Sequence, residues 1–137
     1  TYGSLMCDDI MGAVTAAAPL RPVPARLAGY RRAPVAGADY PGMVPAAEGR
    51  VEGVLYLDLP AAAWPRLDAF EGDEYRRCEV EVELPDGHRL TAWAYVFKPE
   101  YAARLGEGEW SFQRFLATGK ARFEALYLGF DTLGRVD

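Results

Sequence analysis

Histidine is nearly absent from this sequence, which contains only His88 among its 137 residues. His88 follows Pro85-Asp86-Gly87, a run that is typical of a turn. Zinc sites of the usual kind draw on several histidines or on closely spaced cysteines, so we expect no metal site. The same shortage weakens a Ser-His-Asp or Cys-His arrangement, because every candidate nucleophile would need this one imidazole.

Cysteine is also scarce, and the two residues present, Cys7 and Cys78, lie far apart in the chain. A disulfide framework in a small secreted protein uses more cysteines than this, so the pattern favours a reducing compartment. We therefore expect two unpaired thiols and a cytoplasmic protein. No phosphate-binding loop or dinucleotide fingerprint occurs either, and we expect no cofactor.

Two further features are missing: an excess of positive charge and a long apolar run. The 20 acidic residues outnumber the 15 basic ones, whereas nucleic-acid surfaces need clustered Lys and Arg. The longest apolar run, Ala13 to Leu20, is interrupted by Thr15 and Pro19 and is too short to cross a bilayer. We expect no nucleic-acid partner and no membrane insertion, and we find no targeting segment. Small neutral or zwitterionic substrates remain open.

The centre of the chain carries the clearest structural pattern. Trp64, Leu67 and Phe70 recur every three residues, which predicts a short helix that starts near Ala62 and ends at Glu71, before Gly72. Alternating apolar and acidic residues then predict a strand from Arg76 to Leu84, paired as a hairpin with Arg89 to Phe97. The length suits one domain, residues 1–137, of α+β class.

Glu71 lies where this helix meets the strand. A carboxylate next to a buried Phe at a helix end can lose water, which would raise its pKa toward that of a general base. Alternatively, Glu71 belongs to a solvated acidic connection together with Asp73 and Glu74. The local pattern leaves both interpretations open.

A second candidate site is the N-terminal run Tyr2-Gly3-Ser4-Leu5, which resembles the end of a strand that turns into a short helix. Gly3 permits unusual backbone conformations, and the amides that follow could converge into a small anion-binding concavity. A plain junction between strand and helix is the alternative interpretation.

The remaining segments give weaker predictions. Arg26 to Arg32 and Val51 to Leu57 predict strands, the second of them central, with Gly53 marking a close approach of another backbone or a ligand. The Pro- and Gly-rich stretch 34–49 predicts a loop, with a tight turn at 40–43 that covers a pocket or packs on the surface. Near the C-terminus we expect one helix from Ser111 to Gly119 and another over 120–128. Their inward side chains are predicted to be Phe112, Phe115, Leu116, Phe123, Leu126 and Tyr127.

Several motifs, taken in order, resemble the γ-glutamylcyclotransferase-like family, to which plant avirulence-induced proteins and bacterial relatives belong. The resemblance covers roughly Tyr2 to Phe97, and the last 40 or so residues match less clearly. It is carried by Tyr2-Gly3-Ser4-Leu5, by Gly49-Arg50-Val51-Glu52-Gly53-Val54-Leu55-Tyr56, by Leu67-Asp68-Ala69-Phe70-Glu71 with Tyr75 and Arg77, and by Ala94-Tyr95-Val96.

The resemblance implies a small mixed β-barrel or sheet with flanking short helices. It implies that Tyr2, Gly3, Ser4 and Leu5 bind the substrate's α-carboxylate through backbone amides, and that Glu71 is the catalytic acid and base. The substrate would be a small γ-glutamyl amide, whose α-amine attacks its own γ-carbonyl to release 5-oxoproline and an amine, without a cofactor. The alternative is a non-catalytic protein that uses the same pocket for binding or interaction. The sequence leaves the leaving amine and the oligomeric state open.

Overall fold

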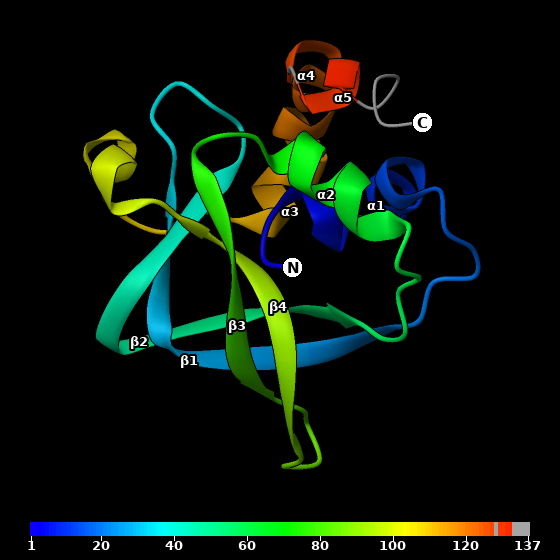
Figure 1. The fold of residues 1–137 in the computed structure, drawn as a ribbon. Coiled ribbons are helices and arrows are strands. Elements are labelled where there is room, and N and C mark those ends of the chain that lie inside the picture. Colours follow the sequence, from blue (N-terminus) through cyan, green and yellow to red (C-terminus); the bar gives the residue numbers. More distant parts are fainter. Residues whose placement is uncertain (128, 133–137) are drawn as a thin grey trace.

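Two antiparallel hairpins form the sheet of this computed structural model, which describes residues 1–127 and 129–132. The first hairpin pairs β1 (Pro22–Pro34) with β2 (Pro41–Tyr56), and the second pairs β3 (Tyr75–Glu83) with β4 (Arg89–Phe97). The strand order is β2-β1-β3-β4. One register pair, Arg26 with Glu83, joins β1 to β3, and the two hairpins cross each other (Figure 1).

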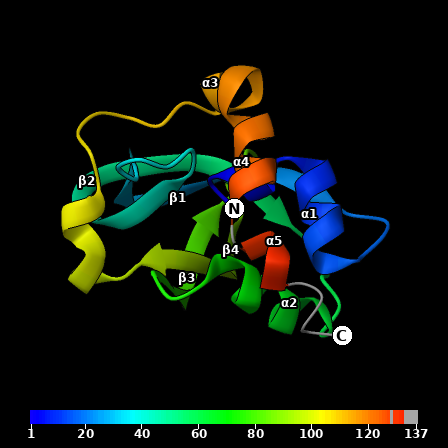
Figure 2. The same cartoon turned by 90° about the horizontal axis from the view of Figure 1, so that it is seen from above.

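The helices gather at one end of these strands (Figure 1). They are α1 (Asp8–Thr15), α2 (Ala63–Glu71), α3 (Phe112–Arg114), α4 (Lys120–Leu126) and α5 (Gly129–Thr132), with a 3₁₀ turn η1 (Ser4–Met6) and a π turn η3 (Phe115–Gly119). A further 3₁₀ turn, η2 (Pro99–Arg104), lies apart from them after β4 (Figure 1). Seen from above, the N-terminus lies near the middle of the molecule, among the helices (Figure 2). The prediction of an α+β fold, with a small sheet and flanking short helices, is confirmed.

The main core lies where the helices pack together against the N-terminal turn and the sheet. Leu67 and Phe70 of α2 are almost fully buried there, as their spacing predicts. Other members include Ile10, Met11, Val14, Phe115 and Phe123. A second cluster lies against the curved sheet, where Val80 and Val82 are buried while Glu79 and Glu81 are exposed. The central helix and the hairpin that follows it therefore match the sequence prediction.

The loop predicted for residues 34–49 is wrong, because β2 begins at Pro41 and only residues 35–40 connect the two strands. The predicted central position of 51–57 is also wrong, because β2 is an end strand in the sheet order. The loop prediction fails because prolines such as Pro41 and Pro45 are tolerated in an edge strand. Thr1 pairs with the outer side of this strand: its N-terminal nitrogen donates to the Val54 oxygen at 2.7 Å, and the Val54 amide donates back at 2.9 Å.

The C-terminal helices differ from the prediction in two ways. Ser111 caps the first one as expected, its hydroxyl accepting from the Arg114 amide at 3.2 Å. The helical segment does not end at Gly119, however, because the π turn η3 continues directly into α4. Leu116 and Leu126 are 48% and 70% exposed instead of buried. The end of the second predicted helix, residue 128, lies outside the described residues.

The structure also bears on the predictions about the thiols and about membrane insertion. Cys7 and Cys78 are both free thiols, the first buried and the second partly buried. Over the described ranges, no helix is long and apolar enough to cross a bilayer.

Candidate active site

A cavity of about 80 Å³ lies between the N-terminal turn, α2 and the C-terminal helices. This is several times the ~10–15 Å³ needed to hold one water molecule. Glu71 lines it together with all four residues of the Tyr2 to Leu5 turn, so the two sequence motifs converge on one site. The other lining residues are mostly apolar or aromatic: Thr1, Met11, Tyr40, Pro41, Tyr56, Leu59, Trp64, Leu67, Phe70, Tyr75, Ala94, Tyr95, Phe123 and Tyr127.

Glu71 is the last residue of α2 and is held there by the helix packing. Phe70, one residue earlier, is 1% exposed and belongs to the main core. Gly72 follows with φ +81°, a conformation that side chains other than glycine rarely adopt, and its amide donates to the Asp68 carbonyl. The helix end therefore fixes the backbone from which the Glu71 side chain meets the cavity.

The Glu71 carboxylate has no hydrogen-bond or ion-pair partner among the described residues. Burial raises its pKa from 4.5 to about 8, opposed by the Thr1 ammonium and reinforced by the Asp68 carboxylate. A carboxyl group with a pKa in this range can both accept and donate a proton near neutral pH.

The neighbouring acids have different surroundings. Glu74 forms an ion pair with Arg104 and accepts from the Tyr40 hydroxyl at 3.3 Å, and it does not line this cavity. Asp73 is exposed. Of the three acids in this connection, only Glu71 lines this cavity.

The N-terminal turn uses all four of its carbonyl groups. The Tyr2 oxygen accepts from Arg32 Nη1 at 2.9 Å, and the Leu5 oxygen accepts from the Tyr56 hydroxyl at 2.9 Å. The Gly3 and Ser4 oxygens accept from the amides of residues 6 and 7 at 3.0 and 3.1 Å.

The amides of the same turn are in the opposite situation. Across the described part of the chain, the N–H groups of Gly3, Ser4 and Leu5 have no acceptor. A run of unpaired N–H groups whose carbonyls are already bonded gives a local positive potential that suits an anion. Gly3 is needed for this geometry, because a Cβ there would lie 2.8 Å from Pro41 Cδ.

Tyrosines form much of the cavity wall, and the hydroxyls of several of them donate hydrogen bonds to backbone oxygens. The Tyr2 hydroxyl donates to the Tyr95 oxygen, and the Tyr75 hydroxyl donates to the Pro41 oxygen, each at 2.7 Å. Tyr127 donates to the oxygens of residues 70 and 71. Sequence reasoning placed Tyr127 in the core but missed its place in the cavity wall. A hydroxyl within an apolar stripe was the available signal, since buried Tyr oxygens need partners.

One rim of the cavity carries a cluster of aromatic and charged side chains. Tyr95 donates a hydrogen bond to the Asp68 carboxylate, which also lies 3.6 Å from the Arg77 guanidinium. Arg77 in turn lies over the rings of Trp64 and Trp93, at 4.6 and 5.4 Å from their centroids. Trp64 and Tyr95 both line the cavity, so this cluster stiffens its edge.

Comparison with known proteins agrees with this architecture. The family described as "Gamma-glutamyl cyclotransferase, AIG2-like" matches residues 1–112. The chain belongs to this family. AIG2-like protein C of Arabidopsis thaliana is 32% identical over 123 residues, which are 89% of this chain and 70% of that protein.

Solved structures show the same fold. A solution structure from Arabidopsis thaliana has a TM-score of 0.66 and 29% identity, covering 91% of this chain and 83% of that one. A gamma-glutamyl cyclotransferase has a TM-score of 0.65 at 15% identity, covering 100% of this chain and 85% of that one, a likeness that concerns the fold.

The family match and the cavity do not end at the same residue. The match stops at residue 112, whereas Phe123 and Tyr127 complete the cavity wall. Part of the candidate site therefore comes from a segment beyond the matched region. Among the residues that the structure describes, no three His, Cys, Asp or Glu side chains gather as metal ligands.

Proposed function

We propose that this protein cleaves γ-glutamyl amides by intramolecular cyclisation and releases 5-oxoproline and an amine. The observation that carries the proposal is the pairing of two unsatisfied groups in one cavity. The Glu71 carboxylate has no partner, and the amides of the Tyr2 to Leu5 turn have no acceptor, among the described residues. Together they match the two charged groups at the α-carbon of a γ-glutamyl substrate.

The binding roles follow from charge. The α-carboxylate would accept hydrogen bonds from the amides of Gly3, Ser4 and Leu5, as anions do at such turns. The α-ammonium would then lie beside Glu71. In the free cavity, a pKa of about 8 leaves Glu71 largely protonated at neutral pH. A neighbouring ammonium favours the ionised carboxylate, so substrate binding would itself generate the base.

The reaction then needs one proton carrier. Glu71 accepts a proton from the α-ammonium, and the freed amine nitrogen attacks the γ-carbonyl carbon to form the ring C–N bond. As the tetrahedral intermediate collapses, Glu71 passes this proton to the leaving nitrogen, and the bond to the amine breaks. The ionised Glu71 then takes the second proton from the ring nitrogen and delivers it to the released amine, which leaves as an ammonium ion. The nucleophile is tethered to its electrophile, so the cavity mainly has to hold the substrate in a ring-like conformation.

The proposal is tested by incubating the purified protein with a panel of γ-glutamyl amides and quantifying 5-oxoproline. Release from at least one amide is expected, together with its loss in the Glu71→Gln variant. Calorimetric binding of the same amides without any release would instead identify a binding protein on this fold. Absence of both binding and release would reject the proposed substrate class.

A further inference from the structure

A second, more open hollow of about 720 Å³ lies on the other side of Glu71. We call it the outer groove. It is lined by residues of the 37–40 loop, by residues 69–74 at the end of α2, and by parts of the C-terminal segment, including Arg122 and Leu126. Five residues line both the cavity and the outer groove: Tyr40, Phe70, Glu71, Phe123 and Tyr127. The two spaces are therefore separated by a wall formed by these side chains, and Glu71 is part of that wall.

Tyr127 closes this wall. Its ring meets the Tyr40 ring edge-on at 5.2 Å and the Phe70 ring at 5.0 Å, so it bridges the 37–40 loop and α2. It also stacks on Phe123 at 4.7 Å. Its hydroxyl donates to the oxygens of Phe70 and Glu71 at 2.7 and 3.0 Å, which ties the ring to the backbone that carries Glu71.

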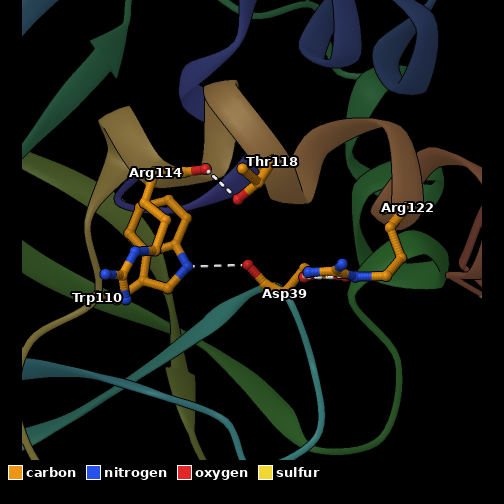
Figure 3. A network of polar contacts seen from close by, with 5 residues as sticks. All are labelled: Asp39, Trp110, Arg114, Thr118 and Arg122. Atoms are coloured by element: carbon orange, nitrogen blue, oxygen red, sulfur yellow. Dashed lines mark hydrogen bonds and ion pairs between the residues drawn. The ribbon is translucent and has the colours of Figure 1, made fainter.

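The segment that carries Tyr127 is anchored on Asp39, as Figure 3 shows. Arg122 Nε donates to the Asp39 carboxylate at 2.8 Å, and Trp110 Nε1 donates to the Asp39 backbone oxygen at 2.9 Å. Gly119 packs closely enough that an added Cβ would lie 3.3 Å from Asp39 Oδ1. Asp39 thus contacts the C-terminal segment at three places, and the wall has a fixed position relative to the loop next to Tyr40.

We propose that Tyr127 is a specificity-determining residue that limits the amine portion of the substrate to small groups. This inference rests on the proposed function. The bond to be cleaved must lie next to Glu71, and Glu71 stands in the wall, so a γ-glutamyl group in the cavity places its amine against the wall. A small amine fits on the cavity side, whereas a bulky one would need the space that the Tyr127 ring closes off. Removal of the ring would join the cavity to the outer groove.

The kinetic test compares γ-glutamyl methylamide with γ-glutamyl benzylamide in the wild-type protein and in Tyr127→Phe, Tyr127→Leu and Tyr127→Ala variants. The wild type and Tyr127→Phe are expected to prefer the methylamide in kcat/KM by about tenfold or more, a typical effect of pocket size. Tyr127→Leu and Tyr127→Ala should reduce this preference stepwise, mainly by lowering KM for the benzylamide. Leu126→Ala, which alters only an exposed residue of the outer groove, should retain the wild-type ratio. An unchanged ratio in Tyr127→Ala, or a wild type without size preference, overturns the inference.

A second measurement does not depend on turnover. In a Cys78→Ser background, Glu71→Cys introduces a thiol into the wall, and its modification by methyl and benzyl methanethiosulfonate is followed by mass spectrometry. Tyr127→Ala should raise the rate of thiol modification by the benzyl reagent, relative to that by the methyl reagent, by about tenfold, whereas Tyr127→Phe should leave this rate ratio unchanged. Equal rate ratios in the Glu71→Cys protein with Tyr127, with Tyr127→Phe and with Tyr127→Ala would reject the inference that the Tyr127 ring separates the cavity from the outer groove. A changed labelling ratio in a protein that cyclises no γ-glutamyl amide would reject the proposed function and leave the wall in place.

Discussion

The guanidinium of Arg32 lies 2.9 Å from the carbonyl oxygen of Tyr2 and also donates to the backbone oxygen of Glu52 at 3.3 Å. It therefore ties the start of the Tyr2 to Leu5 turn to β2. The guanidinium lies over the Trp110 ring as well, 5.4 Å from its centroid. Arg32 joins the turn, β2 and the start of the C-terminal segment, without itself lining the cavity.

Replacement of Arg32 by Met should loosen the turn and weaken substrate binding. Loss of a charged donor to a partly buried carbonyl costs about 1.5–3 kcal/mol, so KM should rise by about tenfold or more. The effect on kcat should be smaller, because Glu71 is held by α2. Arg31→Met is the matched control, since Arg31 is the exposed neighbour on the same strand. Steady-state kinetics with a γ-glutamyl amide measure both constants, and equal KM values in the two variants would contradict the positioning role.

Some parts of the fold and site could be predicted from the sequence because one local signal dominates them. The spacing of Leu67 and Phe70, followed by Gly72, determines where α2 ends and hence where Glu71 lies. Gly53 was predicted to mark a close approach, and the backbone of Thr1 packs directly against it. These predictions depend on residues close together in the chain or on the absence of a side chain.

Other parts depend on partners that local patterns do not reveal. Pro41 and Pro45 suggest a loop until the strand that holds them is known to lie at a sheet edge. Gly119 suggests a helix end, but it provides room for Asp39, 80 residues earlier in the chain. Tyr127 suggests core, and only its contacts with Tyr40 and Phe70 place it in the cavity wall.

Two glycine substitutions should have opposite effects. In Gly3→Ala the new Cβ would meet Pro41 Cδ at 2.8 Å, so the turn has to move and both stability and substrate binding should fall. Gly12 lies within helix α1, and in Gly12→Ala the new Cβ would lie 3.9 Å from Leu20 Cδ1, an ordinary contact distance. The second variant should gain about 0.5–1 kcal/mol from helix propensity and retain full activity. Urea unfolding and KM measurements on both proteins test the pair, and a Gly3→Ala variant with wild-type KM would show that the turn tolerates a side chain.

Glu71→Gln separates catalysis from binding. The change preserves size but removes the proposed proton carrier, so kcat should fall by the ~10²- to 10⁴-fold typical of lost acid and base catalysis. Substrate affinity measured by calorimetry should largely persist, because the turn amides are untouched. Glu74→Gln is the control: its carboxylate pairs with Arg104 outside the cavity, so activity should stay near wild type and stability should change by about 1 kcal/mol or less. If Glu74→Gln lost activity while Glu71→Gln retained it, the catalytic role would have to be reassigned.

The same carboxyl group should make the stability of the protein depend on pH. Burial raises the Glu71 pKa from 4.5 to about 8. Between these two values the folded protein keeps the Glu71 proton while the unfolded chain has lost it. The folded state thus binds more protons, and the free energy of unfolding must decrease as pH rises.

The contribution of Glu71 is therefore fully present below about pH 4.5, declines as pH increases, and is lost above about pH 8. Glu71→Gln cannot titrate, so its unfolding free energy should lack this component. Urea unfolding of both proteins from pH 4.5 to 8.5 measures the difference at each pH. Wild type should lose stability relative to Glu71→Gln across this range, and parallel curves would mean that the Glu71 carboxyl titrates as it does in water.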